Sequence, residues 1–280
     1  MSTNLDQMRN AYDGYPEREW ERLVGGAQAR LEFIVTMHAI GKHLPPVSDR
    51  TVRVLDAGGG PGRYTIALAQ QGYRMILLDL SPRLLEVARR QIGAAGPDVQ
   101  SRVEAVVEGS ITDLGRFADG EFDAVLCLGG PLSHLVDKID RAQAIAELRR
   151  VAAPNAPILI SVMNRIGACR SAVQWPDWFP GVFPSLVEGG VTLVGPGRAP
   201  TYFFLLEELC AELGDGGLDV RHLYGCNGIG AHLDEENLLA LMEDGERWPA
   251  WRDVLLQTCD HPSVVGVSNH ILAVAHQAYG

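Results

Sequence analysis

Apolar residues fall along this chain in two alternating patterns, short continuous runs and longer segments with a period near 3.6. The runs are bounded by turn residues and predict buried strands, whereas the periodic segments predict amphipathic helices. The expected strands are 52–55, 74–78, 103–107, 122–128 and 158–163, with helices between them at 64–71, 82–92, 111–117 and 138–151. This alternation favours an α/β fold with a doubly wound parallel sheet.

Two further regions flank this core. Residues 15–42 are predicted to form a helix that ends before Pro45 and Pro46. Residues 164–200 show no clear period, and a loop of this length is usually functional. The pattern then resumes, with helices at 205–213, 234–243 and 249–258 and strands at 220–224 and 270–276. We therefore divide the chain into an N-terminal helical cover (1–46), a cofactor-binding core (47–163), an inserted lid (164–203) and the C-terminal part of the core sheet (204–280).

Composition narrows the class of protein. A chain of 280 residues with 46% hydrophobic content can bury one substantial core. The sequence contains no apolar run of bilayer length and no signal-peptide pattern at its start, so we expect a cytoplasmic protein without a membrane partner. The net charge of −11 argues against binding nucleic acid. The five cysteines include no C-x-x-C pair and are interpreted as reduced thiols.

The turn after the first predicted strand is the chemically most informative segment. Glycine stands at every second position, Gly58, Gly60 and Gly62, so the backbone can turn sharply and a ligand can approach without meeting a Cβ. The spacing is not the G-x-G-x-x-G of dinucleotide-binding proteins. Asp79 follows about 20 residues later, where a carboxylate would accept hydrogen bonds from ribose hydroxyls. We expect a nucleotide-like cofactor on this turn.

With Asp56, these glycines form D-x-G-x-G-x-G, which resembles motif I of the class I S-adenosylmethionine (SAM) methyltransferases. The closest likeness is to bacterial small-molecule enzymes of the ubiquinone-biosynthesis type, specific over residues 51–163 and looser beyond. It implies a Rossmann-like seven-stranded sheet, with SAM as the cofactor. The residues that it implies for binding SAM are Asp56, Gly58, Gly60, Gly62, Asp79, Leu80, Ser110, Ile111, Cys127, Leu128, Tyr15 and Arg22.

Four of these residues carry alternatives, and for Asp56 the alternative is a structural acid that orders the turn. Ser110 stands where related enzymes often have Asp reaching the adenine amine, which leaves adenine recognition to its hydroxyl or to backbone groups. Tyr15 lies in a segment that resembles the cover folded over SAM in related enzymes, and its ring would face the sulfonium. Arg22 would pair with the SAM carboxylate. The alternative for both Tyr15 and Arg22 is an ordinary amphipathic surface helix.

The loop after the fourth predicted strand resembles motif IV, which lies beside the transferred methyl group. Enzymes that methylate nucleobase amines carry Asn or Asp and then Pro-Pro here, whereas this chain has Gly-Gly-Pro-Leu at 129–132, which argues against a nucleic-acid acceptor. Only Asp137 lies near among acidic ligands, so we expect no metal. His134 is the candidate catalytic residue, able to take a proton near neutral pH. Its alternative role is to pack on the loop or to cap the following helix.

The sequence indicates the residues of the acceptor site less clearly than those of the cofactor site. Trp175 and Trp178 are expected to roof it, or else to hold the insertion together as a small core of its own. Tyr224, after the sixth strand, is a further candidate. The predicted function is methyl transfer from SAM to an oxygen or nitrogen of a small metabolite, with carbon also possible. The alternatives are a non-methylating reaction such as a cyclisation, or a regulatory subunit without catalysis. The sequence does not indicate an oligomeric state.

Overall fold

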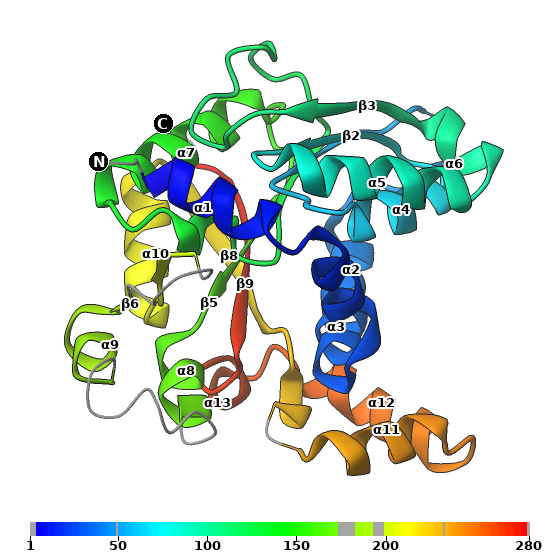
Figure 1. The fold of residues 1–280 in the computed structure, drawn as a ribbon, viewed down its shortest axis with the longest axis vertical. Helices are drawn as coiled ribbons and strands as arrows, with labels where there is room; N and C mark the ends of the chain where they lie inside the picture. Colours follow the sequence, from blue (N-terminus) through cyan, green and yellow to red (C-terminus); the bar gives the residue numbers. More distant parts are fainter. Residues whose placement is uncertain (1–3, 49, 173–182, 193–198, 232, 279–280) are drawn as a thin grey trace.

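The computed structural model describes residues 4–48, 50–172, 183–192, 199–231 and 233–278. Its centre is a seven-stranded sheet with helices on both faces (Figure 1), in the order β3-β2-β1-β4-β5-β9-β8. The first five strands of this order are parallel, and β9 runs antiparallel to both neighbours. The predicted Rossmann-like sheet is confirmed, including the last strand inserted beside β5. The strands are β1 (Arg53–Ala57), β2 (Arg74–Asp79), β3 (Val103–Glu108), β4 (Ala124–Cys127), β5 (Ile158–Met163), β8 (Leu218–Gly225) and β9 (His270–Gln277).

Each strand of the centre is apolar on both sides because both faces of the sheet are covered. Val54 belongs to one buried cluster and its neighbour Leu55 to the other, since successive side chains of a strand point to opposite faces. The first cluster joins the sheet to α3 (Ala27–His43), α4 (Arg63–Gln70) and α5 (Pro82–Ala94). The second joins it to α7 (Lys138–Val151) and α10 (Leu206–Asp215).

The order of strands places the site. Chain connections leave β1 toward β2 on one side and reach β4 on the other, so the carboxyl ends of β1 and β4 flank a switch point. In open α/β sheets, ligands bind in the crevice at such a point. The turn that begins at Gly58 lies there, and so does η1 (Pro131–His134), which follows β4.

The N-terminal region differs from the single helix predicted for residues 15–42. Two helices, α2 (Pro16–Gly25) and α3, meet at Gly26, whose ψ of 154° breaks the helical path. The pair Gly25-Gly26 has the lowest helix propensity after proline, which explains the break. An unpredicted helix, α1 (Asn4–Asp13), precedes them.

Two other local predictions are wrong. Residues 111–117 form turns instead of a helix, because Ser110 and Asp113 bond the nearby backbone N–H groups of Thr112 and Gly115. The short helix α6 (Pro97–Arg102) was not predicted. Helix α5 begins at an N-cap, because the Ser81 hydroxyl accepts a hydrogen bond from the Leu84 N–H at 3.1 Å.

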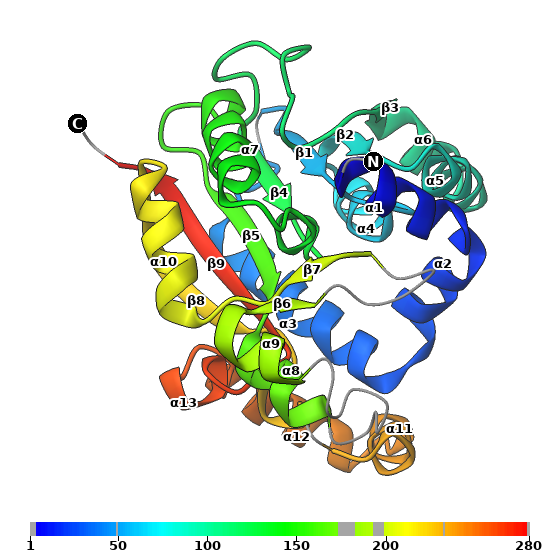
Figure 2. The same cartoon turned by 60° about the vertical axis from the view of Figure 1, so that its left-hand side comes forward.

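The insertion after β5 forms small elements beside the main sheet. Figure 2 shows its two-stranded sheet, β6 and β7, near the lower ends of β5 and β9. The elements of this region are α8 (Arg165–Ser171), α9 (Phe183–Gly189), β6 (Val191–Thr192) and β7 (Thr201–Tyr202). Beyond β8 come η4 (Gly228–Gly230), α11 (Glu235–Glu243), α12 (Arg247–Thr258) and α13 (Pro262–Val265). Across the described ranges, no helix is both long and apolar enough to cross a membrane.

Candidate functional site

The glycine turn between β1 and α4 has a backbone that other residues would strain. Gly58, Gly60 and Gly62 have φ values of 78°, 54° and 85°, in the left-handed region. A Cβ on Gly58 would also lie 2.5 Å from Pro131 Cγ. A Cβ on Gly60 would meet nothing closer than Leu84 at 3.7 Å, so this part of the turn borders open space. The turn therefore presents main-chain groups where a ligand can reach them.

Two buried carboxylates hold this turn in different ways. Asp56 Oδ2 accepts a hydrogen bond from the Thr65 hydroxyl at 2.6 Å, while its Oδ1 has no partner among the described residues. Asp79 accepts hydrogen bonds from the N–H groups of Gly60 and Ser81, both at 2.8 Å. Burial raises the pKa of each carboxyl to about 6. Asp56 lies behind the turn, whereas Asp79 faces the space in front of it.

A cofactor cavity lies in front of the turn, between the sheet edge and helices α1 and α2. It holds about 100 Å³, and about 850 Å³ when its open mouth is included. The predicted residues that line it are Gly58, Gly60, Asp79, Leu80, Ser110, Ile111, Leu128, Arg22 and His134. Those that do not line it are Asp56, Gly62, Cys127 and Tyr15. Gly62 caps α4, and Cys127 is fully buried in β4 below the cavity floor.

The cations of the cofactor cavity are already engaged with the protein. Arg22 donates from Nε and Nη2 to Glu19 at 2.8 and 2.6 Å. Burial acts to lower the pKa of Arg22, but this paired carboxylate raises it above its usual value. Arg63 lies 4.1 Å above the ring of Phe33, and burial lowers its pKa. Both guanidinium groups stand on the cavity wall, beside the N-terminus of α4, where a ligand carboxylate is favoured.

His134 is 5% exposed and bonded on both sides of its ring. Its Nδ1 lies 3.1 Å from the carbonyl oxygen of Pro200, which can only accept, so Nδ1 carries the proton. Its Nε2 therefore accepts from the Tyr12 hydroxyl at 2.7 Å. Burial lowers the pKa of His134, which is neutral near pH 7. Burial also raises the pKa of Tyr12, which stays protonated. Sequence reasoning missed Tyr12 as a partner because the contact spans 122 residues.

An acceptor cavity adjoins the first. It holds about 920 Å³ with its mouth included, and Tyr12 and His134 line both cavities. Its walls come from α1, η1, β5, α8, β6, β7 and the start of β9. Tyr15, predicted to cover SAM, lines this cavity instead, because the chain turns between α1 and α2.

The predicted acceptor residues are placed elsewhere. Trp175 and Trp178 lie outside the described residues. Tyr224 lines neither cavity, which corrects its assignment to the acceptor. Its side chain is 2% exposed in the core beside α3, where its hydroxyl lies 2.8 Å from His43 Nε2. Tyr224 lies on the part of β8 that faces α3, so its ring fills the core.

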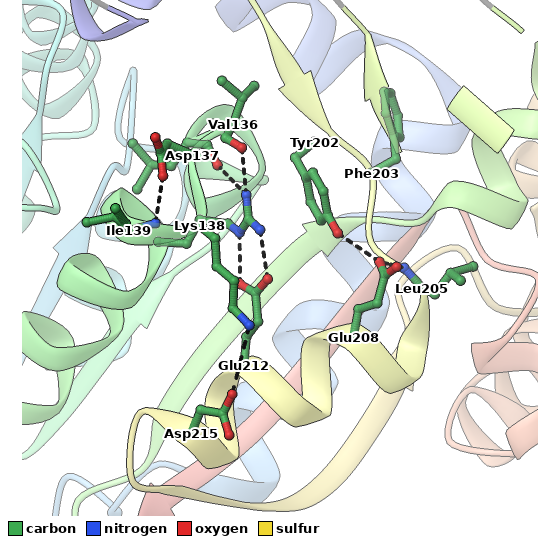
Figure 3. A network of polar contacts seen from close by, with 12 residues as sticks. Val136, Asp137, Lys138, Ile139, Tyr202, Phe203, Leu205, Glu208, Glu212 and Asp215 are labelled. Atoms are coloured by element: carbon green, nitrogen blue, oxygen red, sulfur yellow. Dashed lines mark hydrogen bonds and ion pairs between the residues drawn. The ribbon is translucent and has the colours of Figure 1, made fainter. Parts of the chain in front are cut away.

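A buried polar network holds the loop that carries His134 (Figure 3). Arg141, 3% exposed, donates to the carbonyl oxygens of Leu135 and Val136 at 3.0 and 2.9 Å. The same guanidinium bonds both carboxylate oxygens of Glu212 on α10 at 2.8 and 2.7 Å. It also lies 3.9 Å from the ring centre of Tyr202 on β7. One side chain thus ties the His134 loop to the strand that lines the acceptor cavity.

Within the described parts of the chain, no group of three or more His, Cys, Asp or Glu side chains is placed to hold a metal ion. The residues do fit SAM. One cavity contains three features that suit SAM. They are a glycine turn with exposed main-chain groups, the Asp79 carboxylate at the sequence position where a ribose-binding acid is expected, and an enclosed apolar surface.

Comparison with known proteins agrees with this geometry. A family described as "Methyltransferase domain" matches residues 54–155. The chain is 28% identical to a ubiquinone biosynthesis O-methyltransferase of Xanthomonas axonopodis pv. citri, over 80% of this chain and 85% of that protein. It is 31% identical to a glycine/sarcosine N-methyltransferase of Parasynechococcus marenigrum, over 52% of this chain and about half (48%) of that protein.

Solved structures share the fold at low identity. The 1,6-didemethyltoxoflavin-N1-methyltransferase of Burkholderia thailandensis, solved with S-adenosylhomocysteine, matches with a TM-score of 0.55 and 16% identity, covering 100% of this chain and 92% of that one. The 4+2 cyclase SpnF matches with a TM-score of 0.60 and 18% identity, covering 100% and 98%. At these identities the likeness shows the fold alone, because one fold supports several reactions.

Proposed function

Since the chain belongs to the class I SAM-dependent methyltransferases, we propose that it transfers the methyl group of SAM to an oxygen or nitrogen of a small metabolite, leaving S-adenosylhomocysteine. One observation carries this proposal. The cavity in front of the glycine turn and the acceptor cavity share Tyr12 and His134 as a common wall. A transferase needs two bound molecules to meet at one point, and these two cavities meet there.

The cofactor cavity supplies the groups that SAM requires. The Asp79 carboxylate is held by two N–H groups and is oriented to accept from ribose hydroxyls. Leu80, Ser110 and Ile111 offer the apolar and polar surface for adenine. Arg22, or Arg63 beside it, would bind the carboxylate of SAM. When bound, SAM supplies a methyl group that is already activated by its sulfonium.

The shared wall would hold the acceptor for reaction. Aligning two reactants can lower the barrier by roughly 7–11 kcal/mol. A general base raises the rate by about 10²- to 10⁴-fold, which corresponds to a smaller decrease of the barrier. The main role of the enclosed walls is therefore to orient the acceptor and exclude water. Neutral His134 accepts at Nε2 from the Tyr12 hydroxyl, so its role would be to orient Tyr12 on the shared wall.

A small molecule suits the acceptor cavity better than a polymer. The described residues that line it include no lysine or arginine, and the chain carries a net charge of −11. Nucleic-acid binding depends on clustered cations. The names of the two relatives also refer to small molecules. One relative acts in ubiquinone biosynthesis, and the other acts on glycine or sarcosine.

The test is methyl transfer from deuterium-labelled SAM to a metabolite extract, with products read by mass spectrometry. We expect one labelled product that is absent without the protein. It would identify the acceptor and the methylated atom. SAM that binds tightly but labels nothing, in extracts from several growth conditions, would contradict methyl transfer and favour a non-methylating or regulatory role.

A further inference from the structure

A second histidine faces the acceptor cavity, at the first position of β9. His270 Nδ1 lies 2.8 Å from Glu32 Oε1 on α3, a contact between residues 238 positions apart. The two side chains are 17% and 15% exposed, and His270 lines the acceptor cavity together with His134. The Glu32 carboxylate thus holds the imidazole of His270, as a carboxylate holds the histidine of a catalytic triad.

The hydrogen bond fixes which ring nitrogen is available. An ionised carboxylate can only accept, so Nδ1 of His270 carries a proton and Nε2 keeps its lone pair. The described residues provide no hydrogen-bond partner for this Nε2. His134 differs here, because the Tyr12 hydroxyl occupies its Nε2.

The surroundings keep the carboxylate charged. Burial acts to raise the pKa of Glu32, but His270, Arg22 and Arg63 together hold it below its usual value. A charged carboxylate would stabilise the imidazolium that forms when Nε2 of His270 takes a proton. His134 has only a neutral carbonyl, that of Pro200, at its Nδ1. The two histidines thus differ in the group that accepts from Nδ1, a carboxylate for His270 and a carbonyl for His134.

We propose that His270, oriented by Glu32, is a catalytic base for an acceptor with a hydroxyl group bound in the acceptor cavity. This assignment rests on the proposed methyl transfer. The acceptor O–H bond breaks, its proton goes to Nε2 of His270 and its electron pair stays on oxygen. That oxygen forms the new bond to the methyl carbon, and the electron pair of the broken carbon–sulfur bond returns to sulfur. His134 and Tyr12 would then orient the acceptor from the opposite side.

The chemistry of the walls narrows the acceptor further. The described lining residues beside His270 are mostly neutral, including Ser171, Thr201 and Asn269. None of them offers a cation for a carboxylate or phosphate. The acceptor class is therefore an uncharged hydroxyl compound, such as a phenol or a neutral alcohol.

The first test needs no acceptor. The full chain is treated with diethyl pyrocarbonate, which modifies unprotonated imidazole, at a series of pH values, and each histidine is followed by peptide mass spectrometry. His276 is the matched control, because it lies on the same strand and its Nδ1 contacts a neutral carbonyl, that of Asn155, at 3.1 Å. We expect His270 to react. Glu32→Gln removes the charged acceptor that fixes the Nδ1–H of His270, so the rate of His270 modification should change by at least about threefold, with His276 unchanged.

An unreactive His270, or a modification rate that Glu32→Gln leaves unchanged, would overturn the assignment even if methyl transfer is established. Conversely, a failed labelling experiment leaves the diethyl pyrocarbonate result readable, so the two failures are distinct. On an acceptor identified by labelled SAM, His270→Asn should lower kcat by about 10²- to 10⁴-fold, with S-adenosylhomocysteine affinity unchanged and partial rescue by added imidazole. His276→Asn should retain kcat. Full activity in His270→Asn would exclude His270 as the base.

Discussion

The two cavities of this protein are built by different means. The cofactor cavity is formed mainly by one turn of backbone and the ends of adjacent parallel strands, so its key residues lie close together in sequence. The acceptor cavity is assembled from residues of seven separate described elements, from α1 to β9. The difference shows why the cofactor can be inferred from a short motif while the acceptor cannot. Backbone sites leave glycine signatures, whereas side-chain sites depend on tertiary contacts.

The largest effect is expected from Arg141→Met, which should destabilise the His134 loop and its attachment to α10. The change leaves Glu212 buried without its partner and removes the bonds to Leu135 and Val136. Breaking a buried pair costs about 3–5 kcal/mol, measurable as the free energy of unfolding in urea. S-adenosylhomocysteine affinity should change by less than about threefold, or under 1 kcal/mol.

The matched control for that change is Asp215→Asn, on the same helix. Its carboxylate lies 4.0 Å from Lys138 Nζ, and the two side chains are 76% and 68% exposed. An exposed pair contributes about 0–1 kcal/mol. Equal losses in the two variants would contradict the structural role given to Arg141.

The next effect, from Gly58→Ala, should act on the cofactor side. The new Cβ would overlap Pro131, and φ of 78° strains any L-residue. Strain and overpacking together cost about 2–4 kcal/mol, so we expect at least a 30-fold loss of S-adenosylhomocysteine affinity by calorimetry. Gly41→Ala in α3 is the control, since its Cβ would meet nothing within 4 Å. It should stabilise the fold by about 0.5–1 kcal/mol, and a matching loss of affinity there would refute the explanation.

Asp79→Asn separates binding from stability. Loss of a charged hydrogen-bond acceptor should weaken S-adenosylhomocysteine binding by about 10- to 100-fold. Burial raises the pKa of Asp79 from 3.8 to about 6, so the folded chain binds more protons than the unfolded chain in that window. The contribution of this group to the free energy of unfolding is therefore present below pH 3.8 and is lost as the pH rises through 6.

At pH 7.5 the ligand-free Asp79→Asn variant should consequently be more stable than the natural chain, by about 1–2 kcal/mol after the loss of one N–H bond. At pH 4 the gain should disappear. Thermal melts at both values measure this. A variant that is less stable at pH 7.5, or that binds S-adenosylhomocysteine normally, would contradict the role of this carboxylate.

The smallest effect is expected from Tyr12→Phe, at the wall that the cavities share. Removing one hydroxyl leaves Nε2 of His134 without its donor and should cost about 0.5–1.5 kcal/mol of stability. The reaction of His134 with diethyl pyrocarbonate should rise. Tyr73→Phe also removes one hydrogen bond, to the Pro45 carbonyl at 3.1 Å, but away from both cavities. Equal His134 reactivity in the two variants would show that Tyr12 does not shield it.

The sequence predicted the parts of the molecule that depend on local pattern. Helix α7 has the predicted bounds, and the seven-stranded sheet is the one that the resemblance implies. The motif residues Gly58 and Asp79 lie on the cofactor cavity, and their role in binding SAM stays a prediction. These features succeed because periodicity and glycine spacing are properties of short segments.

What the sequence did not reveal depends on long-range contacts. The pairs Tyr12–His134 and Glu32–His270 join residues 122 and 238 positions apart, and no local pattern marks either. Tyr224 was misplaced because a residue at the end of a strand can face the crevice or the core, and only packing against α3 decides which. The double glycine indicates a helix break at Gly26, but the apolar period on either side of it favours one continuous helix.

A crystal structure of the protein with S-adenosylhomocysteine tests the central claim most directly. The account predicts the ribose hydroxyls on the Asp79 carboxylate, the adenine beside Leu80 and Ile111, and the sulfur directed past His134 toward the acceptor cavity. A ligand bound elsewhere, or with its sulfur turned away from the wall formed by Tyr12 and His134, would contradict it.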